Sequence, residues 1–178
     1  MKIINKACTI WFTGLPSSGK TTLSEMLYKY LKEKNYPVEI FDGDIVRENL
    51  SKGLGFSKED RDTNIKRIGF VCKLLTRNNV FAIAAAISPY KEIRNYNRKE
   101  IKNYVEVFIK CPLEVCIKRD VKGLYKKAIS GEIKNFTGIS DPYEEPDNPE
   151  VIIETDRLTP EESLQIILNK LKSLSYVE

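Results

Sequence analysis

The sequence predicts an α/β fold with a doubly wound, mainly parallel sheet flanked by helices. Short apolar runs alternate with helical patterns from one end of the 178-residue chain to the other, and this alternation is typical of repeated β–α units. The apolar runs lack strict polar alternation, which favours strands that are buried on both faces. The length falls within the usual size of one domain, so we expect a single domain over residues 1–178.

Ten segments carry this alternation. The runs of strand length are Cys8–Phe12, Val38–Phe41, Val80–Ile87, Val105–Ile109 and Val151–Ile153. The helical patterns are Thr21–Lys34, Arg61–Arg77, Ile93–Lys102, Leu113–Arg119 and Pro160–Leu174. The last helix has a distinct start, because Thr159 is a candidate N-cap and Pro160 suits the first helical position.

One segment, about residues 122–148, interrupts the alternation. It is rich in glycine, proline and charged residues, and its aromatic residues Tyr125, Phe136 and Tyr143 are expected to be exposed. A loop of this length in a compact domain is usually functional or disordered. We expect a lid over a substrate, with a disordered hairpin tip as the alternative.

Composition limits the classes of function. The formal charge of +4 comes from 29 basic and 25 acidic residues spread along the chain, a balance that disfavours a nucleic-acid partner. No apolar stretch approaches the ~18 residues of a membrane span, and the N-terminal sequence leaves no room for a signal peptide. The four cysteines form no CxxC pair, so we expect a reduced, cytoplasmic compartment and no membrane partner.

The chain contains no histidine. Its absence excludes Ser-His-Asp triads, HExxH zinc hydrolases and histidine acid–base chemistry. Any general base must therefore be a carboxylate, or a Lys, Cys or Tyr with a shifted pKa.

Residues 14–21 match the phosphate-binding motif GxxxxGKS/T in full, and they lie between a predicted strand and a predicted helix, as that motif requires. Glycines let backbone N–H groups face a phosphate at a helix N-terminus, Lys20 supplies a point charge, and the Thr21 hydroxyl suits Mg²⁺. The sequence thus predicts ATP with Mg²⁺ as the phosphate donor. The residues assigned to this site are Gly14, Leu15, Pro16, Ser17, Ser18, Gly19, Lys20, Thr21 and Thr22.

Among P-loop proteins, the sequence favours a small-molecule kinase. A GTPase would need an NKxD guanine-binding motif, and neither 97–100 nor 169–172 supplies its aspartate. A motor ATPase would be larger and would carry a strand that ends in an acidic pair, whereas Val80–Ile87 is followed by Ser88.

Two carboxylates follow the second predicted strand, in Asp42-Gly43-Asp44. The carboxyl ends of parallel strands form the ligand-binding edge of such a sheet. We expect Asp44 to orient or deprotonate the acceptor hydroxyl and to contribute to the Mg²⁺ site with Thr21. The alternative is that Asp42 and Asp44 only cap the following segment, Ile45–Leu50.

From Trp11 to about Asp156 the chain resembles the adenylylsulfate kinase family. The matching stretches are the P-loop from Gly14, then 42–47, 54–61, 64–65, 67–69, 87–90, 112–116, 119–125, 136–139 and 141–144. Departures are small: Pro16-Ser17-Ser18 stands where Ser-Gly-Ala is common, and Ala84-Ala85-Ala86 precedes Ile87. The resemblance implies transfer of the ATP γ-phosphoryl group to the 3′-hydroxyl of adenosine 5′-phosphosulfate, by a kinase with no attached sulfurylase domain and commonly as a homodimer.

The resemblance also implies an acceptor site. Arg47 and Arg61 would bind the phosphosulfate, with Asn64 as a neutral donor; the alternative is surface ion pairing with Glu48 or Asp60. Phe56 and Phe136 would stack on the adenine, which adds roughly 1–3 kcal/mol without specifying the base; the alternative is a pair of satellite core contacts.

The remaining implied roles fall on the lid and on the end of the third strand. Lys122 would stabilise the transferring phosphoryl group, with Gly123 and Leu124 also at the substrate, and Arg119 would lie against the ATP adenine. Ser88 matches a serine described as a possible phosphoserine intermediate; since no base lies near it in sequence, we expect Ile87 and Ser88 to position the acceptor instead.

Two other functions stay open at this point. One is a kinase of the same fold that phosphorylates the 3′-hydroxyl of another nucleotide, such as a cytidine 5′-diphosphate derivative. The other is a regulatory module that binds nucleotide without catalysis.

Overall fold

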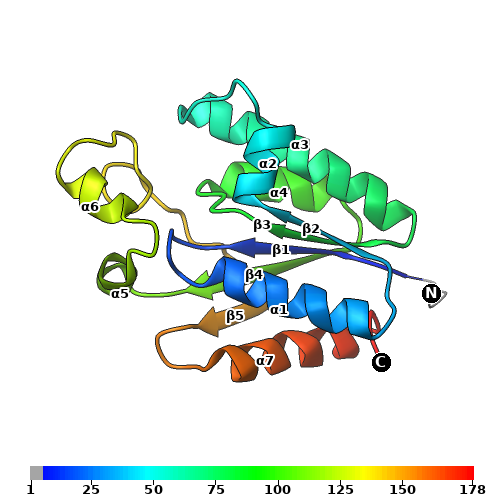
Figure 1. Cartoon of the computed structure of the whole chain (residues 1–178). Helices are drawn as coiled ribbons and strands as arrows, with labels where there is room; N and C mark the ends of the chain where they lie inside the picture. Colours follow the sequence, from blue (N-terminus) through cyan, green and yellow to red (C-terminus); the bar gives the residue numbers. More distant parts are fainter. Residues whose placement is uncertain (1–5) are drawn as a thin grey trace.

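A computed structural model describes residues 6–178, apart from the side chains of Asp44 and Arg47. The strands form one parallel sheet in the order β2-β3-β1-β4-β5, which confirms the predicted sheet (Figure 1). Their bounds are β1 Thr9–Thr13, β2 Val38–Asp42, β3 Phe81–Ala85, β4 Tyr104–Lys110 and β5 Val151–Glu154.

Helices cover both faces of the sheet, as a doubly wound fold requires (Figure 1). Helices α1 and α7 pack against one another on one face, while α3 and α4 pack together on the other. The bounds are α1 Lys20–Glu33, α2 Gly43–Asn49, α3 Lys58–Arg77, α4 Lys91–Glu100, α5 Leu113–Arg119, α6 Leu124–Ile129 and α7 Pro160–Ser173.

The alternation of side chains along β1 fills two cores. Ile10 and Phe12 belong to the core under α1 and α7, whereas Trp11, between them, belongs to the core under α3 and α4. All three side chains are fully buried. Because β1 is the central strand and is buried on both faces, the phosphate-binding loop that follows it starts from the most constrained part of the sheet.

The ends of α1, α4, α5 and α7 lie within two residues of the predicted ends, and the start of α3 differs more. Helix α7 starts as predicted, with a capping box in which Thr159 accepts from the backbone of Glu162 and the Glu162 side chain accepts from the backbone of Thr159. Helix α3 begins three residues before the predicted Arg61, because Ser57 caps it by accepting a bond from the backbone N–H of Asp60.

The lid segment is folded and is fastened at both ends. At its start, Tyr125 lies in α6 and donates a hydrogen bond of 2.9 Å to the carbonyl oxygen of Pro16. At its end, the Tyr143 hydroxyl is 2.9 Å from Thr13 Oγ1, and the backbone N–H of Glu144 donates to Pro89 O at 2.8 Å.

The expectation that the lid aromatics are exposed is wrong. Tyr125 is fully buried and Phe136 is 9% exposed, because their rings pack edge to face, 5.0 Å apart, within a small core that includes Cys116 and Ala128. Tyr143 is half-buried and stacks on Phe108. The segment therefore has its own hydrophobic support.

Two further observations concern the chain as a whole. No helix within residues 6–178 is long and apolar enough to cross a membrane. The four cysteines are free thiols, and all four are buried.

Candidate active site

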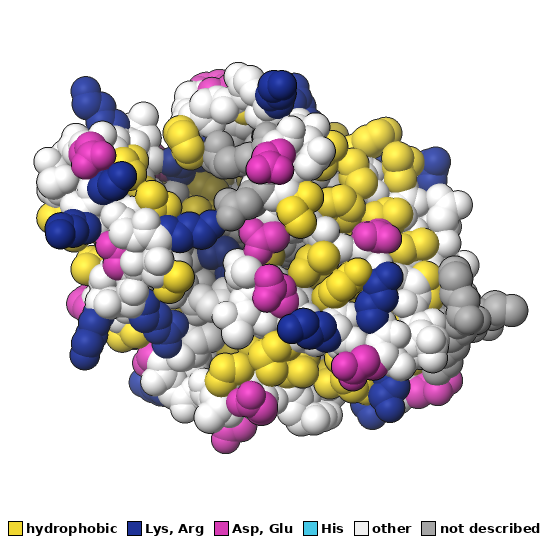
Figure 2. Space-filling model, viewed as in Figure 1, with side chains coloured by type: hydrophobic (Ala, Val, Ile, Leu, Met, Phe, Trp, Pro, Cys, Tyr) yellow, Lys and Arg dark blue, Asp and Glu magenta, His cyan; other side chains and the backbone are white. Residues whose placement is uncertain are grey.

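A cleft of about 1030 Å³ opens at the carboxyl edge of the sheet, between the P-loop, helix α2, the start of α3, the chain after β3, and the lid. Figure 2 shows the hollow between the lid and the helices above the sheet, with basic and hydrophobic side chains at its rim. Sixteen of the predicted site residues line it: Pro16, Ser17, Gly19, Lys20, Thr21, Thr22, Asp42, Phe56, Arg61, Asn64, Ile87, Ser88, Arg119, Lys122, Leu124 and Phe136.

Four of the predicted site residues do not line the cleft. Gly14 and Ser18 are buried beneath the loop, and Leu15 points into the small core of the lid. Gly123 is the left-handed N-cap of α6, with φ of 66°. The side chains predicted at Asp44 and Arg47 lie outside the described part of the structure, although both residues belong to α2.

The P-loop backbone requires glycine at two places. A Cβ atom on Gly14 would lie 2.5 Å from the carbonyl oxygen of Ile109, so no side chain fits there. Gly19 caps α1 with φ of 108°, a conformation that favours glycine. The first turn of α1 is thereby directed at the cleft, where its unpaired N–H groups and the helix dipole favour an anion.

Lys20 lies over the P-loop. Its Nζ donates to the carbonyl oxygens of Gly14 at 3.0 Å and Leu15 at 2.7 Å. Burial lowers the pKa of Lys20 to about 8, although the nearby Cys116 and Asp42 act in the opposite direction. An ammonium group held beside neutral carbonyl oxygens and open to the cleft is suited to a polyphosphate.

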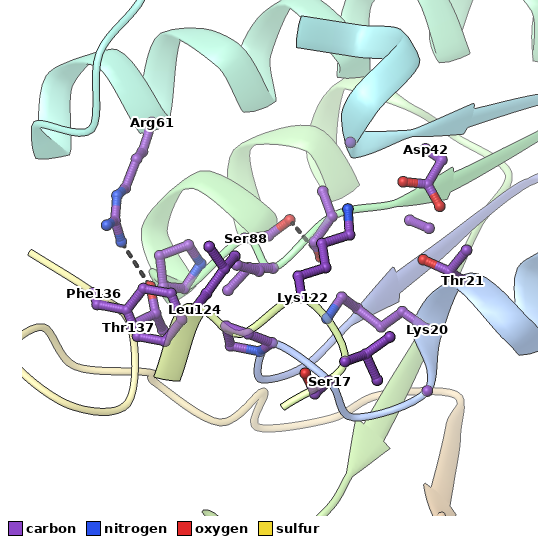
Figure 3. Close-up of a pocket in the computed structure, with 18 of the residues that line it drawn as sticks. Ser17, Lys20, Thr21, Asp42, Arg61, Ser88, Lys122, Leu124, Phe136 and Thr137 are labelled. Atoms are coloured by element: carbon purple, nitrogen blue, oxygen red, sulfur yellow. Dashed lines mark hydrogen bonds between the residues drawn. The ribbon is translucent and has the colours of Figure 1, made fainter. Parts of the chain in front are cut away.

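A carboxylate and a hydroxyl face each other next to Lys20. Asp42, at the end of β2, has a buried Oδ2 atom without a hydrogen-bond partner within the described residues. Figure 3 shows this carboxylate beside the hydroxyl of Thr21. Oxygen donors of these two kinds fit Mg²⁺ and its bound waters, so Asp42 is a candidate for the metal role that the sequence suggested for Asp44.

Ser88 is held from two sides. Its hydroxyl accepts a hydrogen bond from Trp11 Nε1 at 3.0 Å and lies 3.4 Å from the carbonyl oxygen of Ala86. The residue is 1% exposed and has φ of 48°. Strand β3 ends at Ala85 rather than at the predicted Ile87. The adjoining carbonyl of Ile87 accepts from Thr13 Oγ1 at 2.7 Å.

Arg61 connects the start of α3 to the lid. Its Nη1 donates to Thr137 Oγ1 at 2.7 Å and to Asp141 Oδ2 at 2.9 Å. The surface ion pair with Asp60 that we considered is not formed, since Asp60 instead accepts from the backbone of Gly55. Residues 136–139 and 141–144 resemble the family in sequence, but that resemblance did not identify Asp141 as the partner of Arg61.

The two phenylalanines of the predicted base site are in different environments. Phe56 is 59% exposed, whereas Phe136 is 9% exposed and packs on Tyr125. Both line the cleft. Phe136 therefore contributes to a satellite core and to the wall of the cleft at once, whereas most of the Phe56 side chain is exposed to solvent.

The base of the lid contacts the P-loop through Arg119. Its guanidinium donates to the Thr155 carbonyl at 2.7 Å and to the Ser18 carbonyl at 3.4 Å. Thr155 Oγ1, which the sequence gave no reason to select, also donates to Ser18 O, at 2.7 Å. In Figure 3, Lys122 extends into the cleft between Ser88 and Lys20, and Arg61, Phe136 and Thr137 lie at the far end.

The fold and this cleft define a P-loop kinase: a phosphate-binding loop leads out of the central strand of a parallel sheet, and the cleft extends from that loop to the lid. The sequence profile of the adenylylsulphate kinase family matches residues 6–154, and the chain belongs to that family. The resemblance inferred from the motifs is thus confirmed.

Relatives agree over nearly the whole chain. The adenylyl-sulfate kinase of Gloeothece citriformis is 59% identical over 172 residues, which cover 97% of this chain and 98% of that protein. A probable bifunctional SAT/APS kinase 2 of Sorangium cellulosum is 60% identical over 168 residues, 94% of this chain but only 29% of that protein. The structure of the Mycobacterium tuberculosis APS kinase CysC in complex with AMPPNP and APS superposes with a TM-score of 0.89 at 40% identity, covering 94% of this chain and 98% of that one.

Proposed function

We propose that this chain is an adenylylsulfate kinase that transfers the γ-phosphoryl group of ATP to the 3′-hydroxyl of adenosine 5′-phosphosulfate. The observation that carries the proposal is one cleft with two different ends. The P-loop end offers Lys20 and the N-terminus of α1 to a triphosphate, and the far end offers Arg61 with the aromatic residues Phe56 and Phe136 to a second nucleotide. Membership of the family supports this acceptor over other small hydroxyl compounds.

In the proposed reaction, the acceptor 3′-oxygen forms a bond to the γ-phosphorus while the bond from that phosphorus to the β,γ-bridging oxygen breaks, and ADP leaves. Asp44 accepts the hydroxyl proton. Lys20 and Lys122 lie close together in the cleft, and they would offset the negative charge of the phosphoryl group as the transition state spreads it over the equatorial oxygens.

Mg²⁺ would be held by Thr21, with Asp42 and Asp44 bonding its water ligands, and it would neutralise the β- and γ-phosphates. The buried Oδ2 of Asp42, which has no hydrogen-bond partner among the described residues, supports this assignment. The nucleotide contacts proposed for Gly14, Leu15, Pro16, Ser17, Ser18, Gly19, Thr22 and Arg119 involve the same end of the cleft.

Ser88 is proposed to position the acceptor and not to carry a phosphoryl group. Its hydroxyl already accepts from Trp11, and a nucleophilic serine would need a base to remove its proton. Ile87, Asn64, Arg47, Gly123 and Leu124 complete the proposed acceptor site. For direct transfer, holding the two substrates in line is sufficient.

A kinase for another nucleotide remains the second candidate, because stacking on Phe56 and Phe136 tolerates any base. The test is ADP release from ATP and Mg²⁺ with a panel of acceptors: adenosine 5′-phosphosulfate, AMP, CMP, a cytidine 5′-diphosphate analogue, and none. Turnover with adenosine 5′-phosphosulfate alone is the expected result. Preference for a cytidine compound would show that the acceptor is a cytidine nucleotide and not adenosine 5′-phosphosulfate. Absence of acceptor-dependent turnover would favour the non-catalytic regulatory module.

We further propose that the protein is a single domain that acts as a homodimer in the cytoplasm. The four buried free thiols are in keeping with a reducing compartment. Light scattering of the purified protein should give twice the mass of one chain, and a monomer or a larger assembly would contradict the dimer.

A further inference from the structure

A single guanidinium fixes both aromatic walls of the proposed base site. Arg61 Nε donates to the carbonyl oxygen of Phe56 itself at 3.0 Å. Its other two nitrogens donate to the residues on either side of Phe136, namely the carbonyl of Asn135 and the hydroxyl of Thr137. These loops are some 80 residues apart in sequence and are joined here by one side chain.

Asp141 in turn holds the guanidinium. Its Oδ2 atom accepts from Arg61 Nη1 at 2.9 Å and from the Tyr90 hydroxyl at 2.8 Å. The two side chains of the ion pair are only 13% and 21% exposed, so solvent screens the pair less than it screens a surface pair. Tyr90 is buried at the start of α4, and its hydrogen bond therefore anchors the carboxylate to the body of the fold.

The backbone of Asp141 also fastens the loop that carries Phe136. Its N–H donates to Phe136 O at 3.1 Å, and its carbonyl accepts from Gly138 N at 2.8 Å. The side chain and the main chain of one residue thus define both the position of Arg61 and the shape of the loop behind Phe136.

We propose that Asp141 is a positioning residue for the acceptor nucleotide: acting through Arg61, it sets the separation of Phe56 and Phe136 before the base enters. This inference rests on the proposed function, because it treats the space between the two rings as the base site. Without Asp141, the guanidinium would lose its ionic partner and would hold the two loops less firmly. The enzyme would then spend binding energy on ordering them, which weakens acceptor binding and leaves the P-loop end unchanged.

The first test compares Asp141→Asn, Asp141→Ala and Tyr90→Phe with the wild type. We expect KM for adenosine 5′-phosphosulfate to rise about 10- to 100-fold in Asp141→Ala, as for loss of a hydrogen bond to a charged group. It should rise less in Asp141→Asn, which keeps an acceptor oxygen, and in Tyr90→Phe. KM for ATP should stay within about twofold of the wild type and kcat within about threefold. General destabilisation would not raise KM for the acceptor alone.

Asp147→Asn is the matched control. Asp147 is a carboxylate at the end of the lid that pairs with Lys91, and its side chain is 63% exposed. It should leave both KM values unchanged. An Asp141→Ala enzyme whose KM for the acceptor stays within twofold of the wild type, or whose two KM values rise equally, would overturn the proposal.

A second measurement does not depend on turnover. In hydrogen exchange, Asp141→Ala should speed the amides of residues 54–57 and 133–141 together, and it should leave α1 unchanged. Loss of protection in only one loop, or in neither, would refute the connection through Arg61. If the wild type fails to use adenosine 5′-phosphosulfate while both loops lose protection, the proposed substrate is wrong and the connection stands.

Discussion

The indole N–H of Trp11, in the central strand, donates a hydrogen bond of 3.0 Å to the hydroxyl of Ser88 at the rim of the cleft. This bond links the core between β1 and α3 to the residue that resembles a phosphoserine site. The hydroxyl is buried and already accepts this hydrogen bond. Removing it therefore tests two roles separately, since a chemical role affects kcat and a structural role affects stability.

Ser88→Ala should therefore retain activity. We expect kcat within about tenfold of the wild type, whereas loss of a covalent serine nucleophile would lower it by roughly 10⁴-fold or more. The variant should be less stable by about 1–3 kcal/mol, because the Trp11 N–H loses its partner. Steady-state kinetics and denaturant unfolding measure the two effects.

Asp44→Ala should lower kcat by about 10²–10⁴-fold, the usual contribution of a positioned general base. ATP affinity, measured by calorimetry, should change far less, because the base acts on the acceptor. Wild-type turnover in this variant would eliminate Asp44 as the base.

Asp42→Asn should change the metal dependence of the reaction. Removing the charge beside Thr21 should raise the Mg²⁺ concentration needed for half-maximal activity by about 10- to 100-fold, as for other residues that bond the ligands of a metal. Activity at saturating Mg²⁺ should largely recover. An unchanged Mg²⁺ requirement would remove Asp42 from the proposed metal site.

ATP binding should take up a proton near pH 8. Because burial lowers the pKa of Lys20 to about 8, the free protein has both protonation states at that pH, whereas a bound polyphosphate favours the ammonium form. Affinity for ATP should therefore be constant below about pH 8 and fall above it. By the same linkage, the unfavourable contribution of Lys20 to folding is present below about 8 and is relieved as pH rises toward the ordinary value of 10.5.

Calorimetry in two buffers with different ionisation enthalpies measures this uptake. The apparent binding enthalpy should depend on the buffer near pH 8 and much less at lower pH. Lys20→Met should abolish that dependence along with most of the affinity. A wild-type enthalpy that is independent of the buffer near pH 8 would contradict the lowered pKa.

Gly69→Ala should destabilise the protein, although alanine is the better helix former by about 1 kcal/mol. A Cβ atom at Gly69 would lie 2.2 Å from Oδ1 of Asn97, whose buried amide donates to Ile65 O. The crowding should cost about 1–3 kcal/mol and exceed the gain in propensity. Gly43→Ala is the control for denaturant unfolding, since a Cβ there meets nothing within 4 Å; an unchanged midpoint for Gly69→Ala would refute the argument.

The elements were predictable because their signals are local. The apolar runs and the caps around Thr159 gave all five strands and the major helices, but they could not give the order of the strands. That order requires Thr9 to pair with both Ala82 and Tyr104, contacts that no local pattern encodes. The short helix α6 was missed for a related reason: it has few residues, and its stability comes from Tyr125 packing in the lid core.

The site divides in the same way. The P-loop is contiguous, so its residue types and spacing predicted a phosphate site directly, and in the structure Lys20 lies over the loop and lines the cleft. The partners of Arg61 could not be predicted, because Thr137 and Asp141 lie 76 and 80 residues away along the chain. Family resemblance identified these stretches without saying which side chains meet.

The lid is attached to the rest of the protein at both ends, by Tyr125 to the P-loop and by Tyr143 and Glu144 to the sheet side. A single cleavage in the middle of the lid, for instance after the exposed Lys134, would leave each half attached at its own end. We therefore expect substrates to enter beneath the lid or through local loosening of its middle, because both ends of the lid are attached.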